Sequence, residues 1–145
     1  KEGLYRELSR GRLKVVAGLQ ALLDRLTATG VAVALATSAP APNVTHTLGE
    51  VGLTPAFPIV VRGDQVGRGK PAPDVFIEAS RQLHIPAVDC VVFEDAPMGV
   101  VAARAAGMPV VAMTTSFSAA HFAALAQPPD MACADFEAFL AMASW

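Results

Sequence analysis

The chain has 145 residues, of which 53% are hydrophobic and 17% are charged, and its formal net charge is -2. This length suffices for one domain with a buried core, and the apolar fraction excludes an intrinsically disordered chain. The balanced charge and the lack of a basic run predict neither nucleic-acid binding nor membrane binding, so a small-molecule partner is favoured.

Predicted helices and strands alternate along the chain. Apolar residues at helical spacing predict a helix over Val15–Thr29 that ends at Gly30, and the apolar run Val31–Thr37 is typical of a strand covered on both faces. Further strands are predicted at Ile59–Val61, Val91–Phe93, Val110–Met113 and Met131–Ala134. Further helices are predicted at Pro42–Val51, Pro73–His84, Pro97–Ala106, Ala119–Ala126 and Asp135–Met142. This alternation predicts an α/β fold with a parallel sheet.

Composition also bears on where the protein is located. Two stretches without charged residues, Leu26–Gly49 and Ala105–Pro129, contain too many Pro, Ser and Thr residues for membrane spans. The chain starts with no secretory segment, and Cys90 and Cys133 lack C-x-x-C spacing, which favours buried, reduced thiols. We therefore predict a cytoplasmic protein. Its first residue, Lys1, is not Met, so the chain need not be a complete translation product.

Polar residues follow the predicted strands. They comprise hydroxyls, one ammonium and two carboxylates: Thr37, Ser38, Lys70, Glu94, Asp95, Thr114 and Thr115. Because ligands bind outside the carboxyl ends of parallel strands, we expect these groups to share one rim. Singly, the hydroxyls and Asp95 are also explained as turn or helix caps, and Lys70 as a solvated loop charge. Glu94 follows a buried strand and should seek a cation.

As a set, these groups suit a phosphate ester. A hydroxyl and an ammonium bind a phosphoryl group, and adjacent carboxylates supply oxygen ligands to Mg²⁺. A nucleotide-binding G-x-x-x-x-G-K-[ST] loop is rejected, because Asp64 stands at its first Gly and Pro71 at its Ser or Thr. The three histidines show no metal-ligand spacing.

Three segments resemble the haloacid dehalogenase superfamily, in the branch of β-phosphoglucomutase and sugar-phosphate phosphatases. They are Val33–Ser38, Gly69–Phe76 and Val92–Met108, which contain K-P-A-P-D and F-E-D-x-x-x-G. The resemblance implies a Rossmann-like parallel core with helices on both faces over residues 13–145. It implies that residues 1–12 are the end of a helical cap domain and a hinge, with Gly11 as a candidate hinge residue.

The same resemblance implies roles for single residues. Thr37, with Ser38 beside it, would bind phosphate; Lys70 would hold phosphate against the nucleophile; and Asp95 with Glu94 would bind Mg²⁺. The family's nucleophile is the first Asp of a D-x-D-G motif, and no D-x-D occurs in this chain. Its strand would lie between the strands ending at Thr37 and Glu94, so we expect an N-terminal segment of the same protein to complete the sheet and the active site.

The expected function follows from this resemblance. It is a Mg²⁺-dependent phosphohydrolase or phosphomutase that acts on a small phosphorylated metabolite, a sugar phosphate in particular, through an aspartyl-phosphate on an Asp N-terminal to this chain. Two alternatives stay open: a catalytically inert phosphate-binding or interaction module, and a haloacid dehalogenase, which needs no metal. Without the N-terminal strand, the chain should contain two half-sheets with open inner edges.

Overall fold

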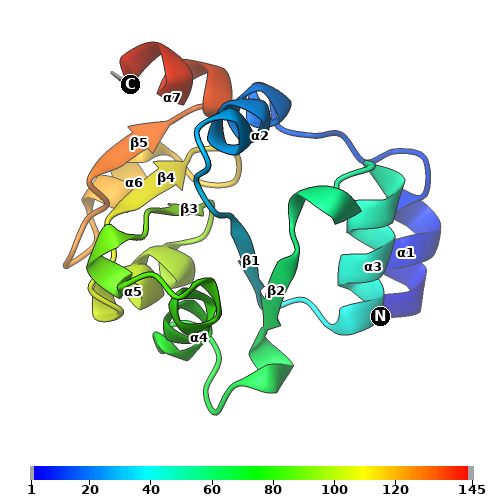
Figure 1. The fold of residues 1–145 in the computed structure, drawn as a ribbon, viewed down its shortest axis with the longest axis horizontal. Coiled ribbons are helices and arrows are strands. Elements are labelled where there is room, and N and C mark those ends of the chain that lie inside the picture. The colour runs from blue at the N-terminus through cyan, green and yellow to red at the C-terminus, as the bar shows by residue number, and fades with distance from the viewer. Residues whose placement is uncertain (1, 144–145) are drawn as a thin grey trace.

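The computed structural model describes residues 2–143, which form an α/β fold of helices and parallel strands (Figure 1). The strands are β1 (Ala34–Thr37), β2 (Ile59–Arg62), β3 (Val92–Glu94), β4 (Val110–Met113) and β5 (Met131–Cys133). The helices are α1 (Glu2–Ser9), α2 (Leu19–Ala28), α3 (Ala41–Glu50), α4 (Asp74–Leu83), α5 (Pro97–Ala105), α6 (Ala119–Ala123) and α7 (Phe136–Met142). Short 3-10 turns are η1 (Thr54–Ala56), η2 (Gly63–Gln65) and η3 (Ala87–Asp89). The predicted order of elements and the α/β fold class are confirmed.

The start of α2 differs from the sequence-based expectation. The predicted helix began at Val15, whereas α2 begins at Leu19, after Gly18 in the left-handed conformation at φ 79°. A Cβ atom at position 18 would lie less than 3.0 Å from the backbone of Phe136 and Glu137. The helical spacing of apolar residues extends back to Val15, which is why the sequence predicted a longer helix. Close packing of Gly18 against α7 instead requires a glycine turn at this position.

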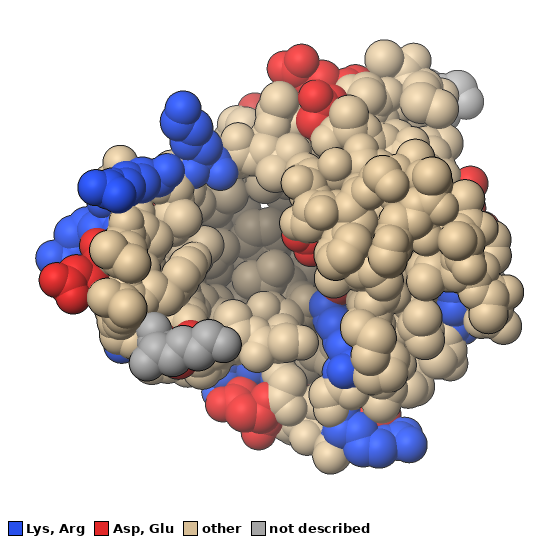
Figure 2. Space-filling view, turned by 180° about the vertical axis from the view of Figure 1, so that it is seen from behind, with Lys and Arg blue, Asp and Glu red and all other residues tan. Residues whose placement is uncertain are grey.

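The strands form two separate parallel sheets. In the first, β1 pairs with β2 so that Ala34 lies opposite Ile59; the second has the order β3-β4-β5. Within the described residues, the inner edges of β1 and β3 have no strand partner. Seen from the opposite side, the molecule is deeply hollowed near its centre (Figure 2). The expectation of two half-sheets with open inner edges is thus confirmed.

Helices cover both faces of the strands, as expected for side chains that alternate between faces. Ala36 of β1 and Ala112 of β4 pack into a core with Phe76 of α4, and this core continues onto α5 and α6. Their neighbours Leu35 and Val111 point to the other face, where α2, α3 and α7 cover them. The core under α4 contains residues of both sheets, so α4 joins the two halves of the fold.

Helix α1 lies beside α3 and is attached to it through polar groups (Figure 1). Arg6 donates a 2.7 Å hydrogen bond to the Asn43 side chain, and the Ser9 hydroxyl lies 2.9 Å from Nε2 of His46. Gly11 follows in the left-handed conformation at φ 67°. The division into residues 1–12 and 13–145 stays a prediction, and its end residues, Lys1 and residues 144–145, lie outside the described part. In that part, no helix is both long and apolar enough to cross a membrane.

Candidate active site

Lys70 joins the carboxyl ends of the two sheets. Its ammonium donates a hydrogen bond to the Ala36 carbonyl of β1, 3.3 Å away, and forms a close ion pair with the Glu94 carboxylate of β3. Only 12% of the Lys70 side chain and 8% of the Glu94 side chain are exposed. A buried charge is tolerated when an opposite charge and hydrogen bonds compensate its lost hydration, and this pair supplies both. The ammonium of Lys70 and the carboxylate of Glu94 therefore meet, whereas Lys70 forms no hydrogen bond or ion pair with Asp95 among the described residues.

The loop before α4 fixes the Lys70 backbone. The Ala72 amide donates a hydrogen bond to the Gly69 carbonyl, which closes a turn around Lys70. On the outer side, the Arg68 guanidinium pairs with the Asp74 carboxylate at 2.9 Å, and hydrogen bonding from Arg68 lowers the pKa of Asp74. The Lys70 ammonium also lies 4.7 Å from the centroid of the Phe76 ring. The turn therefore shapes the backbone at Lys70, and the Phe76 ring is a further contact of its ammonium.

Glu94 lies inside β3, whereas the sequence-based expectation placed it after the strand. Its second carboxylate oxygen accepts a 3.3 Å hydrogen bond from the Ala96 amide. The carboxylate packs directly on Gly99, where a Cβ atom would lie well under 3.0 Å from it. Both oxygens of Glu94 therefore have donors from the protein, and Gly99 leaves the space that the carboxylate fills.

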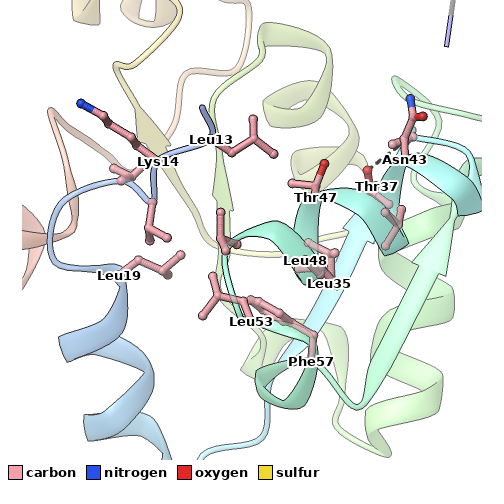
Figure 3. A pocket seen from close by; sticks show the side chains of 15 residues that line it. Leu13, Lys14, Leu19, Leu35, Thr37, Asn43, Thr47, Leu48, Leu53 and Phe57 are labelled. Atoms are coloured by element: carbon pink, nitrogen blue, oxygen red, sulfur yellow. Dashed lines mark hydrogen bonds between the residues drawn. The ribbon is translucent and has the colours of Figure 1, made fainter. Parts of the chain in front are cut away.

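Thr37 ends β1 on the same edge of the fold. Its hydroxyl oxygen accepts a 3.0 Å hydrogen bond from the Ala39 amide, so the hydroxyl proton can be donated to a ligand. Thr37 also lies at the border of a mainly apolar cavity of about 350 Å³, which Leu35, Leu48 and Phe57 help to line (Figure 3). Ser38 is the next residue and is exposed. The alternative of Thr37 as a turn-stabilising residue and its predicted role in phosphate binding are compatible.

Asp95 is exposed and is held by a residue that the sequence analysis did not single out. The Ser116 hydroxyl lies 3.0 Å from one carboxylate oxygen of Asp95. Thr114, which was expected on the rim, instead directs its hydroxyl to the Cys133 carbonyl of β5 at 3.3 Å. The sequence offered one indication of this role for Ser116: it lies in a run of hydroxyl residues shortly after β4.

The fit of a magnesium ion can be tested on these groups. The exposed carboxylate of Asp95 is a hard oxygen donor of the kind Mg²⁺ prefers, and among the described residues only Ser116 engages it, through one oxygen. Glu94 is engaged by Lys70 and Ala96 through both oxygens. Residues 2–143 contain no group of three His, Cys, Asp or Glu side chains that could hold a metal ion. Asp95 would thus fit as one ligand of such an ion, and the other ligands would have to be supplied by groups outside this set.

Comparison with known proteins identifies the family. Residues 2–113 match the family model for haloacid dehalogenase-like hydrolases. The chain belongs to this family. The family assignment made from K-P-A-P-D and F-E-D-x-x-x-G is therefore confirmed.

Individual haloacid dehalogenase-like relatives agree. The chain is 34% identical to protein CbbY of Rhodobacter capsulatus over 114 residues, which is 77% of this chain and 50% of CbbY. It is 38% identical to hexitol phosphatase A of Escherichia coli over 96 residues, which is 66% of this chain and 44% of that protein. These curated relatives are thus about twice as long as the part of them that the chain matches.

A solved structure gives the same result for the fold. The haloacid dehalogenase-like hydrolase of family IA, variant 3, from Entamoeba histolytica superimposes with a TM-score of 0.87 at 26% sequence identity. The match covers 94% of this chain and 62% of that chain. The Rossmann-like arrangement expected from the resemblance is confirmed.

Proposed function

We propose that this chain supplies the phosphate-binding and metal-binding part of a Mg²⁺-dependent phosphohydrolase or phosphomutase that acts on a small phosphorylated metabolite. One observation carries the proposal: the buried Lys70 ammonium bridges the carboxyl ends of β1 and β3 through Ala36 and Glu94, the residues that directly precede Thr37 and Asp95. The names of relatives support a sugar phosphate or polyol phosphate as substrate, since they include hexitol phosphatase A and fructose-1-phosphate phosphatase YqaB.

In this proposal, Lys70 and Thr37 bind the transferring phosphoryl group. The ammonium offsets the negative charge of the phosphoryl oxygens, and the Thr37 hydroxyl donates one hydrogen bond to them, with Ser38 beside it. In phosphoryl transfer, positioning and charge stabilisation provide most of the catalysis. Glu94 orients Lys70 through their ion pair. Its predicted contribution to the acidic metal site would require one of its oxygens to exchange a donor, Lys70 or the Ala96 amide, for the metal.

Asp95 would hold the Mg²⁺, with Ser116 fixing the orientation of its carboxylate. When bound, the metal would neutralise phosphate charge and align the phosphoryl group for attack. The attacking group would be an Asp N-terminal to this chain, which would accept the phosphoryl group and release the alcohol; water would then hydrolyse the aspartyl-phosphate. In a mutase, a second hydroxyl of the substrate would take the place of water.

An N-terminal segment would also complete the sheet. The open inner edges of β1 and β3 lie on either side of the site, and both strands are parallel to their neighbours. A further parallel strand between them would satisfy backbone groups on both edges and bring its carboxyl end beneath Lys70. The division into a cap remnant at residues 1–12 and a core at residues 13–145 belongs to the same proposal.

The test uses the full-length protein, expressed from its complete coding sequence, with sugar phosphates as substrates. Lys70→Ala should lower kcat/KM at least about a hundredfold, because a preorganised group that stabilises developing charge is lost. Arg81→Ala is the matched control, since Arg81 is an exposed cation on α4 that forms its ion pair with the nearby Glu78. Turnover near the wild-type level in Lys70→Ala would contradict the proposal.

Metal dependence is tested separately. Asp95→Asn should raise the Mg²⁺ concentration needed for half-maximal activity, whereas Asp24→Asn, an exposed substitution in α2, should not. The complete coding sequence should encode D-x-D-G upstream of Lys1. Absence of that motif together with absence of turnover would favour the inert module, and metal-independent activity on a 2-haloacid would favour the dehalogenase.

A further inference from the structure

The Lys70 ammonium is enclosed on three sides. The Ala36 carbonyl and the Glu94 carboxylate each accept one of its N–H groups, and the face of the Phe76 ring lies 4.7 Å away. An ammonium has three donors, so two are engaged by the protein and one remains for a ligand. The direction of that remaining donor depends on all three contacts, and the ring is the only one of the three that offers no hydrogen bond.

Phe76 is well placed to act as a fixed support. The residue is 5% exposed and belongs to the core that joins the two sheets. Its amide donates a 3.0 Å hydrogen bond to the Pro73 carbonyl, in the first turn of α4. The ring and the ammonium are therefore carried by one short segment, which the Arg68–Asp74 ion pair and the turn at Gly69 hold in shape.

The electrostatics favour this contact. An aromatic ring carries negative charge on its faces and attracts a cation within about 6 Å of its centroid. The attraction is greatest where water is excluded, and Lys70 is only 12% exposed. An aliphatic side chain of similar volume would fill the same space without attracting the ammonium.

We infer that Phe76 is a positioning residue: the face of its ring holds the Lys70 ammonium between β1 and β3 so that its third N–H donates to phosphate. The inference rests on the proposed function, because it assumes that Lys70 binds the phosphoryl group. It adds a role for the aromatic residue at position 76 that is distinct from its contribution to the core.

The test weakens the ring's attraction for cations without changing its shape appreciably. In the full-length protein, Phe76 is replaced by phenylalanine with one, two and three ring fluorines, and the Kd for inorganic phosphate is measured by calorimetry in the presence of Mg²⁺. Fluorine withdraws electron density from the ring face, so Kd should rise with each fluorine, by roughly tenfold over the series. KM for a sugar phosphate should follow the same trend.

A matched series controls for packing. Phe122 is fully buried in the same core, so fluorination there perturbs packing in a comparable way but should leave the phosphate Kd unchanged. Phe76→Leu should raise Kd by about tenfold as well, and Phe122→Leu provides its control for lost stability. A Kd that is the same across the Phe76 series, or that rises equally in the Phe122 series, would overturn the inference.

The two proposals fail in different ways. If Lys70→Ala binds phosphate and turns over substrate like the wild type, the proposed function is wrong. If Lys70→Ala loses phosphate binding while the Phe76 series shows no trend, the proposed function stands and only the role of Phe76 is wrong.

Discussion

Gly99→Ala tests how tightly the pair of Lys70 and Glu94 is built into the fold. An added Cβ atom would lie well under 3.0 Å from the Glu94 carboxylate, a distance that real Cβ atoms essentially never show. The atoms that it meets are the end of a side chain, so the carboxylate moves away while the backbone of α5 stays in place. The expected consequence is that Glu94 leaves Lys70.

Two opposing effects determine the change in stability. Replacing Gly by Ala inside a helix stabilises it by up to about 1 kcal/mol. Breaking a buried ion pair costs about 3–5 kcal/mol. The side chains of Lys70 and Glu94 are only 12% and 8% exposed, so little water is available to hydrate the separated charges. We therefore expect the free energy of unfolding to fall by about 2–4 kcal/mol, the difference between the two effects.

The assay is urea unfolding of the full-length protein, with the free energy extrapolated to water. The matched control is Gly49→Ala in α3. Gly49 is exposed within a helix, and a Cβ atom there would meet nothing within 4 Å. This control should gain about 0.5–1 kcal/mol, because only the conformational freedom of glycine is lost.

A double-mutant cycle isolates the contact. In the background of Glu94→Ala, the atoms that clash with the new Cβ are absent, so Gly99→Ala should be neutral or stabilising. Two results would contradict a clash between position 99 and Glu94: a Gly99→Ala variant as stable as Gly49→Ala, or the same loss of unfolding free energy with and without the Glu94 carboxylate.

Three further predictions concern stability and thiol reactivity. Residues 1–145 expressed alone should aggregate or unfold without cooperativity, because the inner edges of β1 and β3 are open; a soluble chain with a sharp thermal transition would contradict this. The hydrogen bond from the Val110 amide, with Arg104 nearby, lowers the pKa of Asp130, so this carboxylate stabilises the fold above pH 3.8 and the contribution is lost as the pH falls below that value. Asp130→Asn should therefore lower the urea midpoint at pH 7, and this decrease should become smaller as the pH is lowered. An equal decrease at every pH would refute this. Burial raises the pKa of the Cys133 thiol, so iodoacetamide should modify it far more slowly in the native protein than after denaturation, as peptide mapping can measure.

Local signals explain why most elements could be predicted. Gly30 and Gly107 both adopt the left-handed conformation at the helix ends where they were expected, because glycine is the residue best suited to that conformation. The apolar run at Val110–Met113 became the fully buried strand β4 with the predicted bounds. The predicted start of the first long helix was wrong, because it depends on a contact distant in sequence. Helix α2 begins only after Gly18, since α7 packs closely against that glycine.

The amino-acid sequence by itself determined the α/β class, the family, and the set of polar groups at the carboxyl ends of the strands. These depend on hydrophobic periodicity, glycine and proline positions and short motifs, all of which act over neighbouring residues. Only the tertiary structure decided which partner each group has: Glu94 forms an ion pair with Lys70, whereas Asp95 accepts a hydrogen bond from Ser116. Adjacent residues can point to different neighbours, and which neighbours are present depends on how α4, α5 and the loop after β4 pack in space.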